Sequence, residues 1–136
     1  MGNYYATTRS NYFRVKDAKA FEAWCRKRSL DFWSKSIADL GGCYAITADM
    51  GDCDGWPSYD SLLDIEFDLT AELAGHLDTR DVAILFEIGA EKLRYLNGVA
   101  TAVHPDGKTV RVMLDEIYIR ARKAFGANLT ITPGTY

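Results

Sequence analysis

The chain has 136 residues, of which 48% are hydrophobic and 26% charged, so it predicts one folded domain and excludes disorder throughout. Its net charge of −3 argues against general attraction to nucleic acid or to anionic membranes, and no apolar run is long enough to span a bilayer. The three cysteines, Cys25, Cys43 and Cys53, lack a zinc-binding spacing. We expect a reduced, cytoplasmic protein with Cys25 and Cys43 in its core.

The first part of the chain shows strand patterns around one helix pattern. Aromatic and β-branched residues predict strands, and Asp17 is a typical helix N-cap followed by apolar residues at helical spacing. The expected elements are a strand at 11–16, a helix at 17–28, and strands at 30–35 and 43–48. A helix is the alternative at 30–35. Residues 49–60 have the composition of a loop.

The second part of the chain predicts further strands and two helices. Residues 62–67 alternate as in a strand that turns Asp64 and Glu66 to solvent, and Thr70 is the expected cap of a short helix. Residues 82–86 form an apolar run typical of a central strand, and Pro105-Asp106-Gly107 predicts a hairpin between 99–104 and 108–114. Asp115 is expected to cap a last helix that ends at Gly126.

That last helix places Ile117, Tyr118, Ala121 and Phe125 on one side. Residues 127–136 are expected either to add an edge strand or to stay loose. Together the elements predict one α+β domain over residues 1–136, with a mainly antiparallel sheet of about five to seven strands and two or three helices packed on it.

Charge is distributed unevenly along the chain. Residues 49–91 contain 12 acidic residues and a single base, Arg80, whereas residues 1–48 and 92–136 each carry a net charge of +4. A strongly acidic middle therefore lies between two basic flanks. Such segregation bears on partners and association rather than on the fold.

The acidic loop does not match a known metal site. Asp52 and Asp54 before Gly55 have the spacing of a calcium loop, but Met50 and Ser61 occupy the positions of the first ligand and of the bidentate acid in an EF-hand. We expect no metal and no cofactor.

Catalytic patterns are also weak. Glu87 and Glu91, close to two bases, favour surface ion pairs over acid–base chemistry. His76 and His104 lie outside ligand and nucleophile motifs, and His76 is expected on the exposed side of its helix. These observations predict a protein that is not an enzyme.

Two segments carry a resemblance to other proteins. They are residues 3–17 together with Phe21 and Trp24, and residues 86–98. Together they resemble a group of small uncharacterised proteins encoded on phages, plasmids and integrated elements. The resemblance implies an accessory gene of a mobile element, a setting that often encodes inhibitors of host defence such as anti-CRISPR and antirestriction proteins. It implies no catalytic residues.

The leading hypothesis combines the acidic middle with this resemblance. An acidic surface can act as a DNA mimic, because carboxylates imitate the phosphates that a basic channel binds. The partner would be a host nucleic-acid-binding effector complex, with aromatic side chains adding short-range affinity. Trp56 could instead pack inward and hold the loop to the core. The expected partner-binding residues are Asp49, Asp52, Asp54, Trp56, Tyr59, Asp60, Asp64 and Glu66.

Two alternatives remain open. Bases and aromatic residues interleave in the N-terminal flank, an arrangement that can hold single-stranded nucleic acid. The bases concerned are Arg9, Arg14, Lys16, Arg26, Lys27 and Arg28. The other alternative is a homodimer in which the acidic region of one copy meets the basic region of another.

Overall fold

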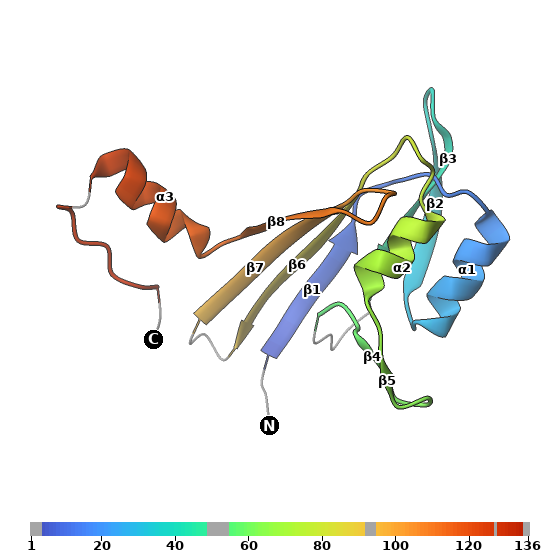
Figure 1. The fold of residues 1–136 in the computed structure, drawn as a ribbon, viewed down its shortest axis with the longest axis horizontal. Coiled ribbons are helices and arrows are strands. Elements are labelled where there is room, and N and C mark those ends of the chain that lie inside the picture. The colour runs from blue at the N-terminus through green and yellow to red at the C-terminus, as the bar shows by residue number, and fades with distance from the viewer. Residues whose placement is uncertain (1–3, 49–54, 92–94, 127, 135–136) are drawn as a thin grey trace.

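The computed structural model describes residues 4–48, 55–91, 95–126 and 128–134 and confirms the α+β class. Its main sheet has four antiparallel strands in the order β1-β6-β7-β8 (Figure 1). These strands are β1 (Tyr4–Ser10), β6 (Ala83–Glu91), β7 (Tyr95–Val103) and β8 (Thr109–Met113). Two ribbons pair β2 (Asp31–Ile37) with β3 (Gly41–Thr47), and β4 (Tyr59–Asp60) with β5 (Ile65–Glu66).

The helices within the described residues are α1 (Ala18–Lys27), α2 (Leu69–His76) and α3 (Glu116–Phe125). The expected cap of α1 is confirmed, because a carboxylate oxygen of Asp17 accepts a hydrogen bond from the Ala20 amide at 3.1 Å. The cap expected for α2 was wrong by two residues. Asp68 accepts from the Ala71 amide at 3.2 Å, and Thr70 donates its hydroxyl to Asp68. None of these helices is long and apolar enough to cross a membrane.

The core lies between one face of the main sheet and the layer formed by α1, α2 and β3 (Figure 1). The sheet contributes Ala83, Leu85 and Val103, and α1 contributes Phe21, which is fully buried. Cys25 and Cys43 are also buried, as expected from the sequence. Burial raises the pKa of the Cys25 thiol to about 12, so this thiol stays protonated at neutral pH.

The first strand was predicted in the wrong place. β1 spans Tyr4–Ser10, whereas Phe13 and Val15 of the expected strand make only isolated bridges to Tyr44 and Leu77. The reason is that β1 buries small and hydroxyl-bearing residues, so its inward face lacks the usual apolar signal.

The buried hydroxyl groups of β1 join the main sheet to the β2–β3 ribbon. Ser10 Oγ accepts a hydrogen bond from the Ile46 amide, and Thr8 Oγ1 accepts one from the Ala48 amide, both at 2.9 Å. Thr47 donates its own hydroxyl to the Thr8 carbonyl at 2.7 Å. Side-chain oxygens therefore replace the strand-to-strand ladder between β1 and β3.

The predicted strands at 30–35, 43–48 and 82–86 are confirmed as β2, β3 and β6. The hairpin around Pro105-Asp106-Gly107 is confirmed as the β7–β8 turn, closed by a hydrogen bond from the Gly107 amide to the His104 carbonyl at 2.9 Å. Gly107 has a φ of 96°, which a residue with a side chain adopts only with strain.

The last helix forms where the sequence predicts it but does not pack on the sheet. No residue of α3 is buried, and α3 extends away from the sheet beyond the end of β8 (Figure 1). Of the two alternatives for the tail, the edge strand does not form within residues 128–134. The Gly134 amide instead donates to the Tyr118 hydroxyl at 2.8 Å.

His76 lies against the core, so the expectation of an exposed side chain was wrong. Its ring is half-buried, with its centroid 5.1 Å from that of Trp24 and 6.0 Å from that of Phe21. Burial lowers the pKa of His76 below its ordinary value of 6.5, because the charged imidazolium loses its hydration.

We expect the His76→Gln variant to flatten the pH dependence of folding stability below pH 6.5. The unfolded chain takes up a proton at His76 at higher pH than the folded chain, so wild-type stability falls as the pH drops below 6.5 toward the lowered folded pKa. Urea unfolding at several pH values across this window measures the slope. An identical slope in both proteins would contradict the assignment.

Candidate protein-interaction site

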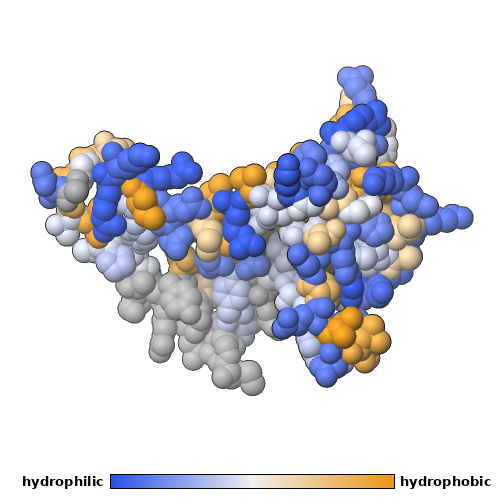
Figure 2. Space-filling model, viewed as in Figure 1, coloured by the Kyte–Doolittle hydropathy of each residue, from blue (hydrophilic) through white to orange (hydrophobic). Residues whose placement is uncertain are grey.

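The β4–β5 hairpin, residues 59–66, carries the most exposed apolar side chain in the described chain. Leu62 at its tip is 94% exposed, and its neighbour Leu63 is 59% exposed. Figure 1 shows the hairpin extending from the body below α1 and α2, and Figure 2 shows hydrophobic side chains gathered at that position. Exposed leucines on a projecting turn are typical of a contact surface.

The turn forms because Asp60 organises the backbone around it. One carboxylate oxygen of Asp60 accepts hydrogen bonds from the amides of Leu62 and Leu63, at 3.0 and 3.2 Å. Asp64 follows with a φ of 54°, in the left-handed region. The predicted strand at 62–67 was therefore wrong over its first half, and only Ile65–Glu66 pairs as a strand.

The base of the hairpin is held by a buried arginine. Arg28 Nη2 lies 2.7 Å and Arg28 Nε 2.8 Å from the two carboxylate oxygens of Glu72, and Nη1 lies 3.5 Å from Asp60. The guanidinium carbon also stands 3.9 Å from the centroid of the Phe67 ring. The hydrogen bond from Arg28 lowers the pKa of Glu72.

This arrangement removes Arg28 from the basic residues expected to contact nucleic acid, since its side chain is 6% exposed and fully engaged. Arg14 is also paired, because its Nη2 lies 2.5 Å from Asp81 Oδ1. Arg80 Nε lies 3.0 Å from Asp78 Oδ1. Arginines therefore neutralise several carboxylates of the acidic middle.

The acidic residues beside the hairpin tip remain at the surface. Tyr59, 51% exposed, donates its hydroxyl to Asp64, and this contact raises the pKa of Tyr59. Glu66 is exposed, and its carboxylate has no partner among the described residues. The hairpin thus combines an apolar tip with two acidic side chains. Asp49, Asp52 and Asp54 of the expected contact set lie outside the described residues.

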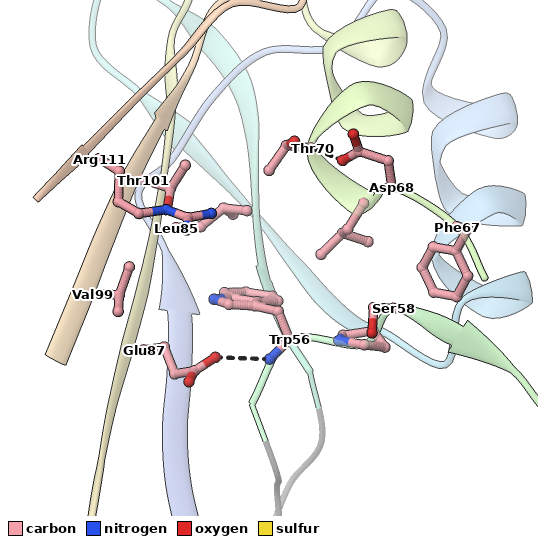
Figure 3. Close-up of a pocket in the computed structure, with 12 residues that line it drawn as sticks. Trp56, Ser58, Phe67, Asp68, Thr70, Leu85, Glu87, Val99, Thr101 and Arg111 are labelled. Atoms are coloured by element: carbon pink, nitrogen blue, oxygen red, sulfur yellow. Dashed lines mark hydrogen bonds between the residues drawn. The ribbon is translucent and has the colours of Figure 1, made fainter. Parts of the chain in front are cut away.

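Trp56 points inward, as the alternative reading of the loop predicted. Its indole Nε1 donates to the Phe86 carbonyl and its amide to Glu87 Oε1, both at 3.1 Å. Figure 3 shows the ring lying across a cavity of about 450 Å³ between the sheet, the segment after Trp56 and the start of α2. Trp56 therefore holds the hairpin segment to the sheet.

The polar groups that line this cavity serve mainly structural roles. Glu87 accepts hydrogen bonds from Tyr4, from the Trp56 amide and from Asn97. Asp68 caps α2. Arg111 reaches in from β8 (Figure 3), and it makes no ion pair within the described part of the chain. The cavity could therefore bind a ligand through its apolar walls and the Arg111 cation. Its described lining holds no paired acid and base for proton transfer.

A second cavity, about 480 Å³, lies between the hairpin and the end of α1. Arg26 and Lys27, both exposed, line it together with Tyr59 and Leu63. Lys16 is exposed before α1. Of the expected basic set, Arg26 and Lys27 are the exposed members beside the hairpin, whereas Arg28 is buried at its base.

Arg9 belongs to a separate basic and aromatic cluster. Its guanidinium carbon lies 5.9 Å from the Tyr12 ring centroid and 5.5 Å from that of Trp33, while Lys35 Nζ lies 5.4 Å from Tyr12. The Trp33 indole donates to the Tyr12 hydroxyl at 2.8 Å. Trp33 and Lys35 were not among the predicted site residues, although residues two apart on a strand share a face.

The chain matches no model of a known protein family, no curated protein sequence and no solved structure. The geometry of these surfaces is therefore the basis on which function is inferred.

Proposed function

We propose that this chain is a non-enzymatic protein-interaction module that binds a protein partner through its β4–β5 hairpin. The observation that carries the proposal is the 94% exposure of Leu62 on a turn that Asp60 and Arg28 hold in place. Because hydrogen bonds to Asp60 already fix the backbone of the turn, binding costs little backbone freedom, and it transfers the leucine side chain out of water.

The charge beside the tip indicates what kind of partner it fits. Asp64 and Glu66 would attract a basic surface and orient the encounter, while Leu62 and Leu63 enter an apolar pocket. Basic surfaces are a property of nucleic-acid-binding proteins. With the resemblance to mobile-element proteins, this supports inhibition of a host nucleic-acid-binding effector, in the manner of an anti-CRISPR protein.

We expect two double variants to lose a partner that the wild-type chain captures from a bacterial lysate. Leu62→Ser with Leu63→Ser removes the apolar tip, and Asp64→Lys with Glu66→Lys reverses its charge. Each is expected to weaken binding to the isolated partner about 10- to 100-fold, as loss of an interface anchor does. Mass spectrometry identifies the partner, and titration measures the affinity.

Leu40→Ser is the matched control, because Leu40 is an exposed leucine in a different turn. Equal capture by wild type and both hairpin variants would refute the proposal. Nuclease treatment distinguishes the alternative function: capture that depends on nucleic acid and survives the hairpin changes would favour the cluster around Arg9, Tyr12 and Trp33.

A further inference from the structure

One face of the main sheet packs on the core, and no helix or strand among the described residues covers the opposite face. The cross-strand pairs Phe86–Ala100–Val112 and Ile88–Gly98 lie on this outer face, since directly paired residues point to the same side. Ile88 is 64% exposed and Phe86 40% exposed. Uncovered sheet faces of soluble proteins are normally polar, so this face requires a partner.

The outer face is hollowed along β7. Gly98 and Ala100 have little or no side chain, whereas Phe86, Ile88 and Val112 stand on the neighbouring strands. Leu114 completes the depression, which has a volume of about 200 Å³ and an almost entirely apolar lining. We call it the outer groove. The Leu114 side chain packs over Gly98, and the remaining apolar hollow suits an inserted apolar ridge.

Helix α3 offers such a ridge. Ile117, Ala121, Ala124 and Phe125 share one side of the helix with Tyr118, and the bases Arg120, Arg122 and Lys123 lie on the other. Ile117 is 61% and Phe125 72% exposed. An isolated helix of ten residues is marginal in water, so α3 would gain stability from packing this side against another surface.

Helix α3 does not reach the outer groove of its own chain. Only Leu114 and Asp115 separate β8 from α3, and hydrogen bonds close this connection. The Met113 amide donates to Glu116 Oε2 at 2.6 Å, and the Ile117 amide donates to the Leu114 carbonyl at 3.1 Å. The fixed connection directs α3 away from its own sheet (Figure 1).

We propose that the chain forms a twofold dimer in which α3 of each copy packs its apolar side into the outer groove of the other. One chain carries both a groove and a ridge, so two copies satisfy both surfaces reciprocally. A different partner would have to supply both a helix for the groove and a surface for α3. The β4–β5 hairpin takes no part in this contact, so the proposal is independent of the proposed function.

The available area is sufficient for a stable dimer. The apolar side chains concerned are between 40 and 72% exposed: Tyr5, Phe86, Ile88, Leu96, Val110, Val112, Leu114, Ile117 and Phe125. At roughly 100 Å² each, they offer about 900 Å² per copy, compared with about 800 Å² per partner in a standard stable interface. The bases of α3 would stay in solvent on its other side.

Sedimentation velocity and light scattering on the full chain test the proposal. Wild type is expected to be a dimer. Phe125→Asp on the ridge and Ile88→Asp in the groove are each expected to raise the dissociation constant of the dimer at least about 100-fold. Ile119→Asp is the matched control, because Ile119 is 69% exposed on the opposite side of α3. This variant is expected to remain dimeric. Circular dichroism checks that every variant is folded.

Mixing the two monomeric variants gives a second, independent readout. The Ile88→Asp chain keeps an intact helix and the Phe125→Asp chain an intact groove, so the mixture is expected to recover a heterodimer held by one of the two contacts. Wild type that stays monomeric at about 100 µM would overturn the proposal, since a specific dimer binds more tightly than that. Dissociation by Ile119→Asp, or failure of the mixture to associate, would overturn the reciprocal exchange.

Discussion

Replacing Phe21 with alanine is expected to lower the free energy of unfolding by about 4 kcal/mol, the middle of the range for deleting a buried aromatic ring. Phe21 is fully buried, and its ring centroid lies 4.9 Å from that of Tyr44 and 5.8 Å from that of Phe13. The rings of Trp24, Phe32 and His76 complete its surroundings. The cavity left by alanine would remove contacts to α1, α2 and the β2–β3 ribbon together.

Urea unfolding at one fixed protein concentration measures this loss. Phe21→Leu fills part of the cavity and is expected to cost less than Phe21→Ala. Leu62→Ala, at the exposed hairpin tip, is the control and is expected to stay within about 0.5 kcal/mol of wild type. A loss below about 1 kcal/mol in Phe21→Ala would contradict the central position of this ring in the core.

The Arg28→Met substitution is expected to lower the free energy of unfolding by about 2–3 kcal/mol at neutral pH. Methionine replaces the aliphatic part of the side chain but leaves Glu72 and Asp60 without their cation. Breaking a fully buried pair costs more, but the Glu72 side chain is 32% exposed, so water offsets part of the penalty. The variant also loses the contact between the Arg28 guanidinium and the Phe67 ring at the base of the hairpin, which lowers stability further.

The Arg28 effect has a definite pH dependence. Arg28 lowers the pKa of Glu72 in the folded chain from its ordinary value of 4.5, so the pair contributes in full above pH 4.5. The contribution is lost as the pH falls through the lowered folded pKa. The difference between wild type and Arg28→Met should therefore shrink in acid. Unfolding curves at pH 7 and at strongly acidic pH measure it, and an unchanged difference would show that the charge pair is not its source.

Local signals in the sequence were sufficient for much of the fold. Asp17 caps α1 because its carboxylate meets an unpaired amide three residues later, and that interaction needs no tertiary context. The turn at Gly107 is equally local. β1 was missed for the opposite reason. Its buried Thr8 and Ser10 are stable inside only because β3 supplies amide donors, and that pairing is not visible in the sequence near β1.

The candidate site was predicted only in part. Tyr59, Asp60, Asp64 and Glu66 do lie together on one hairpin, as their closeness in sequence suggested. The exposure of Leu62 was not foreseen, because an apolar residue within an alternating segment indicates a strand facing the core. Arg28 pairs with Glu72, a residue 44 positions away in the sequence. At that separation, the pattern of charges in the sequence does not identify which residues pair.

The position of β1 at the edge of the main sheet has a consequence for the order of folding. β1 is synthesised before the other described strands, but its ladder partner is β6, so Ser10 pairs with Leu85. The β6–β7–β8 meander closes through local turns, whereas the closure of β1 must bring together segments about 75 residues apart, which is entropically slower. During translation, β1 therefore lacks its ladder partner until β6 has emerged from the ribosome.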